Sequence, residues 1–293
     1  QAPGTPGTPP PPRTRATRAP AMAAPFEVAM KHADNPSNVE SKVDMKLDSM
    51  ARPAIKLSWK GVNYKVPIAA TSDDAAKEPG MSESGTQVYK TLLHSMSGEV
   101  RPTEMMAIMG SSGAGKSTLL DVLAGRVVSE GLDGTVLAND APTDDSFKRI
   151  SGYVMQSDAL FPTLTVTETF TFAARLRSSD QTDASIAATV KATIDSLRLE
   201  KAANTVVGND QLRGLSGGER RRVQIGVDTI HQPQVIFLDE PTSGLDSSTA
   251  LTIVENLKHL AGRSRTIICT IHQPSSKVFN LFDKVVFLHR GHV

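Results

Sequence analysis

The chain has 293 residues, of which 39% are hydrophobic and 22% charged, so it is long enough for one large or two small globular units with an ordinary core. Its formal net charge of +1 gives no electrostatic argument for binding nucleic acid or a membrane surface. A single cysteine, Cys269, excludes an internal disulfide, and no stretch approaches the roughly 18 uncharged apolar residues of a membrane span. The chain as given is therefore predicted to be soluble or peripheral.

The first 50 residues differ in composition from the rest. The opening "QAPGTPGTPPPPRTRATRAP" consists almost entirely of Pro, Thr, Arg, Ala and Gly, and no acidic residue precedes Glu27. This composition predicts a disordered tail over residues 1–50. An Arg-rich, acid-poor start also resembles an organelle transit peptide, but it lacks an amphipathic pattern and does not begin with Met. We favour an incomplete or wrongly started gene model, with Met22 and Met30 as candidate starts.

Short apolar segments bounded by polar or Gly-rich stretches follow from residue 54 and predict strands. Cys269 lies in one of them, "TIICTI", and is expected to be a small core residue in a reducing compartment. The polar stretch 69–86 is expected to be a loop between two strands. The predicted strands are 54–66, 104–110, 134–139, 150–156, 234–240, 265–271 and 284–290.

Helical patterns lie between these strands. One of them opens with "TVTE", in which Thr165 and Glu168 have capping-box spacing. Strands that alternate with helices predict a largely parallel α/β sheet, and the long helical interruption between residues 156 and 234 predicts a helical subdomain set into it. The predicted helices are 116–125, 165–177, 184–198, 217–231, 247–261 and 275–281.

The stretch "GSSGAGKST" at 110–118 fits the phosphate-binding pattern G-x-x-x-x-G-K-[ST], between a predicted strand and a predicted helix. Its glycines let backbone N–H groups face a β-phosphate. Lys116 would supply charge to the β- and γ-phosphates, and Ser117 a hydroxyl to Mg²⁺. The predicted nucleotide-binding residues of this loop are Gly110, Ser111, Ser112, Gly113, Ala114, Gly115, Lys116, Ser117 and Thr118.

An acidic pair closes the strand segment "VIFLDE". In a parallel sheet the ligand lies at the carboxyl ends of the strands, so Asp239 is predicted to hold Mg²⁺ through water and Glu240 to act as the base that polarises the attacking water. Such a pair is often only a solvated turn, but the phosphate loop nearby favours the catalytic interpretation. Gln156, His272 and Asp246 also end strands or enter loops where a γ-phosphate could be sensed.

A second anion site is predicted in "LRGLSGGERRRVQIG", at 212–226. Ser216 and the N–H groups of Gly217 and Gly218 would form it at a helix N-terminus that points outward. The arginines 220–222 could add positive potential, but a basic run is more often a solvated face, and we favour that interpretation.

With these six motifs in this order, residues 55–293 resemble the ATP-binding domain of an ABC transporter. The matching motifs are Walker A at 110–118, the Q-loop at Gln156, the signature "LSGGE", Walker B "VIFLDE", the D-loop "SGLD" and the H-loop at His272. The wording "GYVMQSDALFPTLTVTETFTFAARLR" and "IHQPSS" is most similar to the G subfamily, the white/brown or pleiotropic-drug-resistance type.

This resemblance implies a P-loop NTPase of ABC type, with a mainly parallel core sheet, an antiparallel β subdomain and an inserted helical subdomain. The ATP-binding domain would span 51–293, with the helical subdomain at about 157–232, and the family's transmembrane domain would be absent from this chain and expected downstream, beginning past the point where the chain ends. The implied cofactors are ATP and Mg²⁺, and the implied location is the cytoplasmic face of a membrane.

The resemblance also implies a head-to-tail dimer with a second ATP-binding domain, homo- or heterodimeric. In such a dimer, Ser216, Gly217, Gly218 and Asp246 of one domain serve the nucleotide of the other. Glu240, His272, Gln156 and Lys116 are the implied catalytic residues, and Ser117, Gln156 and Asp239 the implied Mg²⁺ ligands.

One departure concerns the base of the nucleotide. Alignment puts Val66 where many ABC domains stack adenine on an aromatic ring, and Tyr64, on the same face, is expected to be core. The choice between ATP and GTP is therefore open. The leading function is the motor of a membrane exporter. The alternatives are a soluble ABC-type ATPase acting on ribosomes or DNA, for which no second domain, coiled coil or basic arm appears in this sequence, and a non-hydrolysing regulatory subunit, which would need a damaged motif.

Overall fold

The computed structural model describes residues 53–68, 81–84, 87–127, 130–157, 160–177 and 182–293. The predicted disordered tail and most of the predicted loop at 69–86 lie outside the described residues. Within that predicted loop, residues Met81–Ser84 form a short strand, β2, so the loop prediction is wrong for these four residues.

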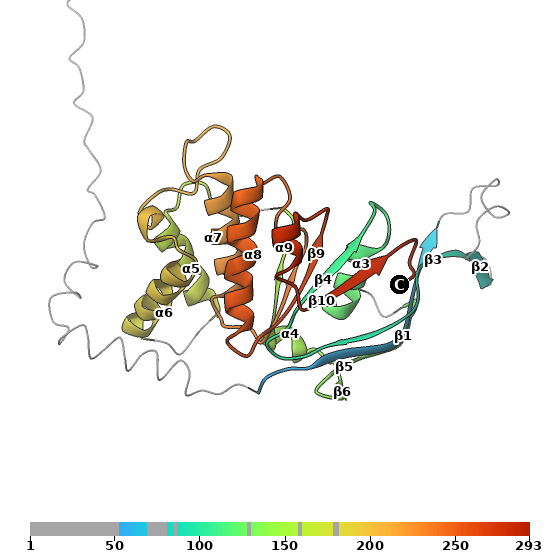
Figure 1. Cartoon of the computed structure of the whole chain (residues 1–293). Coiled ribbons are helices and arrows are strands. Elements are labelled where there is room, and N and C mark those ends of the chain that lie inside the picture. Colours follow the sequence, from blue (N-terminus) through green and yellow to red (C-terminus); the bar gives the residue numbers. More distant parts are fainter. Residues whose placement is uncertain (1–52, 69–80, 85–86, 128–129, 158–159, 178–181) are drawn as a thin grey trace, which may run out of the picture. The chain divides into compact units, whose positions relative to one another are not determined.

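The central sheet is parallel, as the alternation of strands and helices predicts. Its strand order is β10-β4-β9-β8-β7, and every neighbouring pair is parallel. Figure 1 labels β4, β9 and β10 of this sheet. β8 and β9 are buried along their whole length, which explains why their sequences are continuous apolar runs rather than alternating ones. The strands are β4 Met105–Gly110, β7 Ser151–Val154, β8 Val235–Leu238, β9 Thr266–Ile271 and β10 Lys284–Leu288.

A second sheet is antiparallel, with the order β2-β3-β1-β5-β6. The resemblance implied this subdomain, but the sequence pattern did not predict β3, which covers 14 residues. Ser95 has φ 46° within this strand, and the pairing of β1 with β3 shifts register several times, so simple alternation fails here. The strands are β1 Leu57–Ile68, β2 Met81–Ser84, β3 Gln87–Val100, β5 Leu132–Ala138 and β6 Ala141–Pro142.

All six predicted helices are present. Thr165 and Glu168 form the predicted reciprocal cap: Thr165 N donates to Glu168 Oε2 (2.8 Å), and Glu168 N donates to Thr165 Oγ1 (3.2 Å). The helices are α3 Lys116–Leu123, α4 Phe147–Ile150, α5 Val166–Arg177, α6 Asp183–Ser196, the 3-10 turn η2 Glu200–Ala202, α7 Gly217–Thr229, α8 Ser247–Ala261 and α9 Ser276–Phe279. Three of them, α5, α6 and α7, lie between β7 and β8 in the chain (Figure 1).

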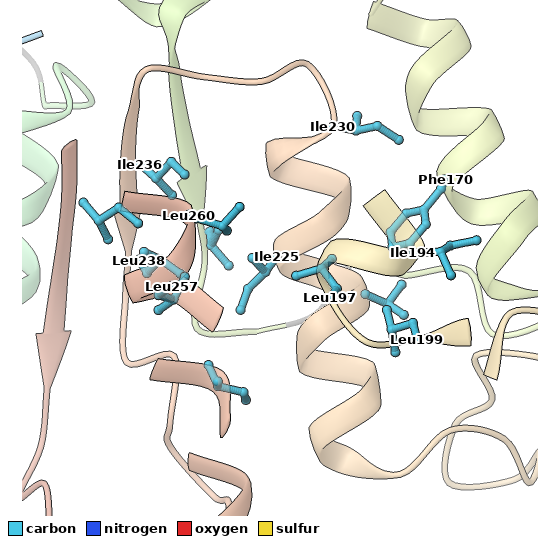
Figure 2. Close-up of a cluster of buried hydrophobic side chains, with 14 of the residues drawn as sticks. Phe170, Ile194, Leu197, Leu199, Ile225, Ile230, Ile236, Leu238, Leu257 and Leu260 are labelled. Carbon is cyan, nitrogen blue, oxygen red and sulfur yellow. The ribbon is translucent and has the colours of Figure 1, made fainter. Parts of the chain in front are cut away.

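The parallel sheet carries a hydrophobic cluster on each face, because successive side chains of a strand point to opposite sides. Met106 and Ile108 of β4 pack with side chains of β1, β3 and α3, whereas Met105 and Ala107 pack with those of α5 to α8. Figure 2 shows the second cluster. Cys269 belongs to it and is fully buried, and burial raises the pKa of its thiol, which confirms the prediction of a core residue.

Helices α5 and α7 approach closely at Gly226. A Cβ atom at this position would lie 2.5 Å from Cε1 and Cζ of the fully buried Phe170 and 2.8 Å from Cδ1 of Leu197. Figure 2 shows these two side chains. The glycine is therefore needed for packing, although it is a poor helix former.

We expect Gly226→Ala to lower the free energy of unfolding by about 1–3 kcal/mol, since the added methyl group must displace a ring that has no free space around it. Thermal unfolding measures this. The matched control is Gly262→Ala at the end of α8, where the new Cβ would meet nothing closer than His259 O at 3.4 Å and φ is −57°. The control should be neutral or slightly stabilising; equal destabilisation of both variants would contradict the packing argument.

Candidate functional site

The loop between β4 and α3 has the conformation of a phosphate cradle. Gly113 (φ 75°) and Gly115 (φ 102°) are in the left-handed region, which other residues adopt at a cost, and Gly115 caps the helix that starts at Lys116. This backbone conformation at the start of a helix is the kind that anion-binding loops adopt.

Lys116 folds over this loop. Its side chain is buried, and Nζ donates to the carbonyl oxygens of Gly110 and Ser111, both at 3.0 Å. These two hydrogen bonds hold the ammonium group of Lys116 against the backbone of the loop.

A hydrogen-bonded chain joins this helix to the acidic pair on β8. Ser117 Oγ donates to Asp239 Oδ1 (3.0 Å), and Thr270 Oγ1 donates to the same oxygen (2.6 Å). The backbone N–H of Glu240 in turn donates to Thr270 Oγ1 (2.8 Å). Thr270 is fully buried on β9 and was missed from the sequence, because "TIICTI" looks like an ordinary strand with a β-branched residue.

Glu240 lies in an unusual backbone conformation, with φ 44°. A left-handed non-glycine residue is disfavoured by roughly 1–2 kcal/mol and persists only where its surroundings hold it. Here the bond to Thr270 holds the backbone, and Gln156 Nε2 donates to the side-chain Oε2 (3.0 Å). The structure therefore brings Gln156 and Glu240 together, as both predicted roles require.

His272 directly follows β9, the strand between β4 and β8. Its side chain is exposed at the carboxyl edge where Asp239 and Glu240 leave β8 and where the P-loop leaves β4. The predicted catalytic residues thus come from adjacent strand ends of one parallel sheet, where ligands bind in folds of this kind.

Arg221 corrects the prediction that the arginine run is a solvated face. Its side chain is buried on α7 and donates to four main-chain carbonyls: Met155 O (2.6 Å), Gln156 O (3.3 Å), Asp239 O (2.9 Å) and Pro241 O (3.2 Å). Gln224, one turn later, donates to Met155 O as well (3.0 Å). One guanidinium therefore fixes the signature helix to the residues around both Gln156 and Glu240.

Arg222 is also engaged rather than solvated, since its Nη1 donates to Leu197 O (2.9 Å) and Arg198 O (2.8 Å), the residues that follow α6. The hydrogen bonds of Arg221 and Arg222 are made to carbonyls of the protein itself and do not direct either guanidinium toward a ligand. Their contacts bind α7 to its surroundings, and a mainly solvated basic run is excluded.

Ser216 caps α7 in a reciprocal box. Its Oγ accepts from Glu219 N (3.3 Å) and donates to Glu219 Oε2 (2.7 Å), while its own N–H donates to the same carboxylate oxygen (2.9 Å). These hydrogen bonds lower the pKa of Glu219. Ser216 and Gly217 are exposed, so the helix N-terminus faces outward as predicted.

Gly218 lies against the start of α8, where a Cβ would come within 2.2 Å of Thr249 Cγ2. Asp246 caps α8 at this place: it accepts from the N–H groups of Ser248 and Thr249 (both 3.0 Å) and from their hydroxyls (both 2.6 Å). These bonds depress the pKa of Asp246 well below its usual range. The signature and Asp246 thus form one surface within the chain, while Lys116, Ser117 and Asp239 form another.

Val66 lies on β1 opposite Lys90 of β3 and is half-buried. Tyr64 packs against the cluster shared by the antiparallel sheet and α3, in agreement with its predicted core position. The prediction that Tyr64 and Val66 share a face assumed strict alternation along the strand. The register shift between Tyr64 and Lys65 interrupts that alternation.

Comparison with known proteins bears on this site directly. Residues 93–243, slightly more than half of the chain, match the family model described as "ABC transporter". The chain belongs to the ABC transporter family. It therefore carries the ATP-binding domain of that family, with the ABC-type P-loop NTPase fold that its sequence predicts.

Members of the G family are similar to this ABC chain over most of its length. "ABC transporter G family member 16" of Arabidopsis thaliana is 46% identical over 86% of this chain and 34% of its own length. "ABC transporter G family member 20" of the same plant is 51% identical over 80% of this chain and 32% of its own. "ABC transporter G family member 5" of Oryza sativa subsp. japonica is 48% identical over 74% of this chain and 27% of its own.

This ABC chain spans about a third of the length of the curated relatives it matches. Among the helices of the described residues, none has the length and apolar character that crossing a bilayer requires.

Proposed function

We propose that this domain binds and hydrolyses MgATP and that the reaction powers transport across a membrane by a G-type ABC transporter. The observation that carries the proposal is the chain of contacts from Ser117 through Asp239 and Thr270 to Glu240 beside the P-loop. It joins a phosphate cradle, an oxygen-rich cation site and a candidate base at one edge of the sheet.

The donor set fits Mg²⁺, which prefers carboxylate, hydroxyl and water oxygens: Ser117 Oγ and Asp239 Oδ1 lie 3.0 Å apart. In this proposal Ser117, Asp239 and Gln156 hold the ion, directly or through water, and the ion supplies positive charge that offsets the charge of the phosphates. Lys116 leaves the carbonyls of its own loop and contacts the β- and γ-phosphates.

Glu240 takes the proton of the attacking water. The new bond forms between the water oxygen and the γ-phosphorus, the bond from the γ-phosphorus to the β–γ bridging oxygen breaks, and ADP and phosphate leave. Gln156 and Thr270 orient Glu240 through the contacts at 3.0 and 2.8 Å, and His272 faces the γ-phosphate from the end of β9.

The exposed N-terminus of α7 supports a shared site. In the proposed head-to-tail dimer, Ser216, Gly217 and Gly218 face the γ-phosphate held by the P-loop of a second ATP-binding domain, with Asp246 beside them. ATP closes this dimer and hydrolysis reopens it. Arg221 supports transmission of the change, because it binds α7 to the backbone on both sides of the site.

A transmembrane domain is the proposed second partner, on the cytoplasmic face of a membrane. An apolar patch on α5 and the segment before it supports this: Phe161, Phe172 and Leu176 are 56%, 48% and 71% exposed, and the two rings contact each other edge to face at 5.9 Å. Patches of this kind mark docking surfaces. A cavity of about 400 Å³ lies beside the segment that precedes Phe161, and its lining includes Met155, Leu160, Arg177 and Asp228.

We expect Phe161→Ala, in the longer protein that contains the membrane domain, to reduce transport about tenfold while ATPase activity and melting temperature stay nearly unchanged, because an exposed ring at an interface contributes to binding rather than to the core. Transport and ATPase assays on reconstituted protein measure this. The exposure of Phe161 disfavours core packing as its role; the half-buried Leu160 is the residue that packs on the core.

The matched control is Phe287→Ala, which removes an equally exposed ring (59%) on β10, away from the patch, and should leave coupling intact. Loss of thermal stability in Phe161→Ala without uncoupling would contradict docking. A membrane domain encoded beyond Val293 would support the transporter against a soluble ABC-type ATPase.

A further inference from the structure

A tight turn after β10 contacts the P-loop at the carbonyl of Ala114. Arg290 (φ 47°) and Gly291 (φ 78°) are both in the left-handed region, and His289 and His292 exchange two backbone hydrogen bonds, at 2.9 and 3.0 Å. These features define a type I′ hairpin turn.

The peptide groups of Gly291 join the turn to two other elements. Its N–H donates to Ala114 O in the P-loop (3.0 Å), and its carbonyl accepts from His94 N on β3 (2.9 Å). Only glycine fits here, since a Cβ would lie 2.4 Å from Leu92 O. The carbonyl of a P-loop residue is thus held by the turn.

A side-chain contact closes the same junction. The imidazole rings of His94 and His292 are stacked, with centroids 4.2 Å apart and planes 3° from parallel. His94 is half-buried and His292 exposed, so both rings can exchange protons with solvent. The stack connects β3 directly to the residue that ends the turn.

We propose that the His94–His292 stack holds the turn 289–292 against the P-loop and so positions the phosphate cradle, and that protonation of the two rings releases it. His94 and His292 are positioning residues in this proposal, which rests on nucleotide binding by the P-loop. Two imidazolium ions about 4 Å apart repel each other, whereas two neutral rings stack favourably.

The direction of the effect follows from the pKa of His94. Burial, and then the neighbouring His292, lower this pKa below its ordinary value of 6.5. The folded state therefore binds fewer protons than the unfolded state, so the contribution of the stack is complete above pH 6.5 and is lost as the pH falls through the lower, folded-state pKa.

The other groups around the stack do not reverse this sign. The turn adds His289 and Arg290, which are exposed and carry no negative charge. On β1 the neighbour is the neutral Asn63, which accepts from Ser95 N (2.8 Å), and Lys116 directs its ammonium at carbonyls of its own loop. Among the described residues, no carboxylate contributes to the shift of His94.

The experiment compares MgADP affinity at about pH 8 and about pH 5.5 in the wild type and in His94→Phe/His292→Phe, which keeps two stacked rings but cannot titrate. Protonation of ADP itself affects both proteins equally. We expect the wild type to lose more affinity than the variant as the pH falls, by up to about fivefold once both rings are charged, because that is the loss that repulsion of two charges at this distance gives in a water-like dielectric. Equal losses would overturn the proposal.

The control is His259→Gln on the exposed face of α8, which should follow the wild-type pH profile. Hydrogen exchange of the Gly291 amide in the nucleotide-free wild type gives a readout that needs no variant. After correction for intrinsic rates, protection at pH 8 that is lost at pH 5.5 supports the proposal that the His94–His292 stack holds the turn. Equal protection at the two pH values contradicts it. Absence of MgADP binding at pH 8 would instead refute the proposed function. The exchange data would still show whether the His94–His292 stack holds the turn 289–292.

Discussion

Glu240→Gln should reduce the MgATP turnover of this domain by about 10² to 10⁴-fold and leave MgATP affinity within a few-fold of wild type, because an amide fills the same volume but cannot accept the proton of the attacking water. Phosphate release and equilibrium nucleotide binding measure the two quantities. Gln156 still has a hydrogen-bond acceptor within reach in this variant, since the new side chain keeps one carbonyl oxygen in place of the carboxylate.

Two further variants serve as comparisons for Glu240→Gln. Glu255→Gln makes the same chemical change on an exposed position of α8 and should have wild-type turnover. Lys116→Ala should weaken MgATP binding itself, because it removes the cation of the cradle. Turnover in Glu240→Gln equal to that of the wild type would remove Glu240 from the role of base and leave its backbone conformation, φ 44°, without a functional reason.

Mixing two inactive variants should restore activity if the site is shared between chains. Ser216→Arg keeps its own P-loop and Glu240 but blocks the opposite site, whereas Lys116→Ala has the complementary defect. Random pairing of equal amounts gives about half heterodimers, each with one whole site, so the mixture should recover up to about a quarter of wild-type activity per chain if one site can act alone. Recovery should increase with protein concentration, because lone domains pair weakly.

The control for this experiment is Thr182→Arg, which removes a different helix cap, the one Thr182 provides for α6 by accepting from Ser185 N (3.3 Å). It costs about as much stability as loss of the Ser216 cap, roughly 1 kcal/mol, and should retain activity. A bell-shaped dependence of phosphate release on mixing ratio supports the shared site. Full activity of Ser216→Arg alone would show that the signature is not part of the catalytic unit.

The parts of the site that the sequence predicts are short motifs, in which the functional residues are neighbours in the chain. The loop 110–118, the pair Asp239 and Glu240, and the anion site at Ser216, Gly217 and Gly218 each combine glycines, acids or hydroxyls at a spacing that favours phosphate chemistry. Parallel strand order then brings Gln156 to Glu240 at 3.0 Å, because their strands are neighbours in the sheet.

Residues that act through distant backbone could not be predicted in this way. Arg221 looks like one of three equivalent arginines until the fold places Met155, Asp239 and Pro241 around it. Thr270 differs from its neighbours in β9 only by a hydroxyl, whose partner is 31 residues away in the chain. Strand β3 was missed for a similar reason: its register shifts are set by pairing with β1 and not by its own pattern.

Arg221 also bears on how this domain can change in evolution. Its long-range partners at Met155, Asp239 and Pro241 are main-chain oxygens, which every amino acid at those positions supplies. Substitution of these partners therefore keeps the acceptor, whereas lysine in place of the arginine loses the fixed fork that reaches several oxygens at once. A genetic suppressor of an Arg221 variant accordingly has no partner side chain to adjust at these three positions. It can act only at the one side-chain acceptor that the structure shows for Arg221, Gln224 Oε1, by moving a strand end, or by stabilising the packing of α7 elsewhere.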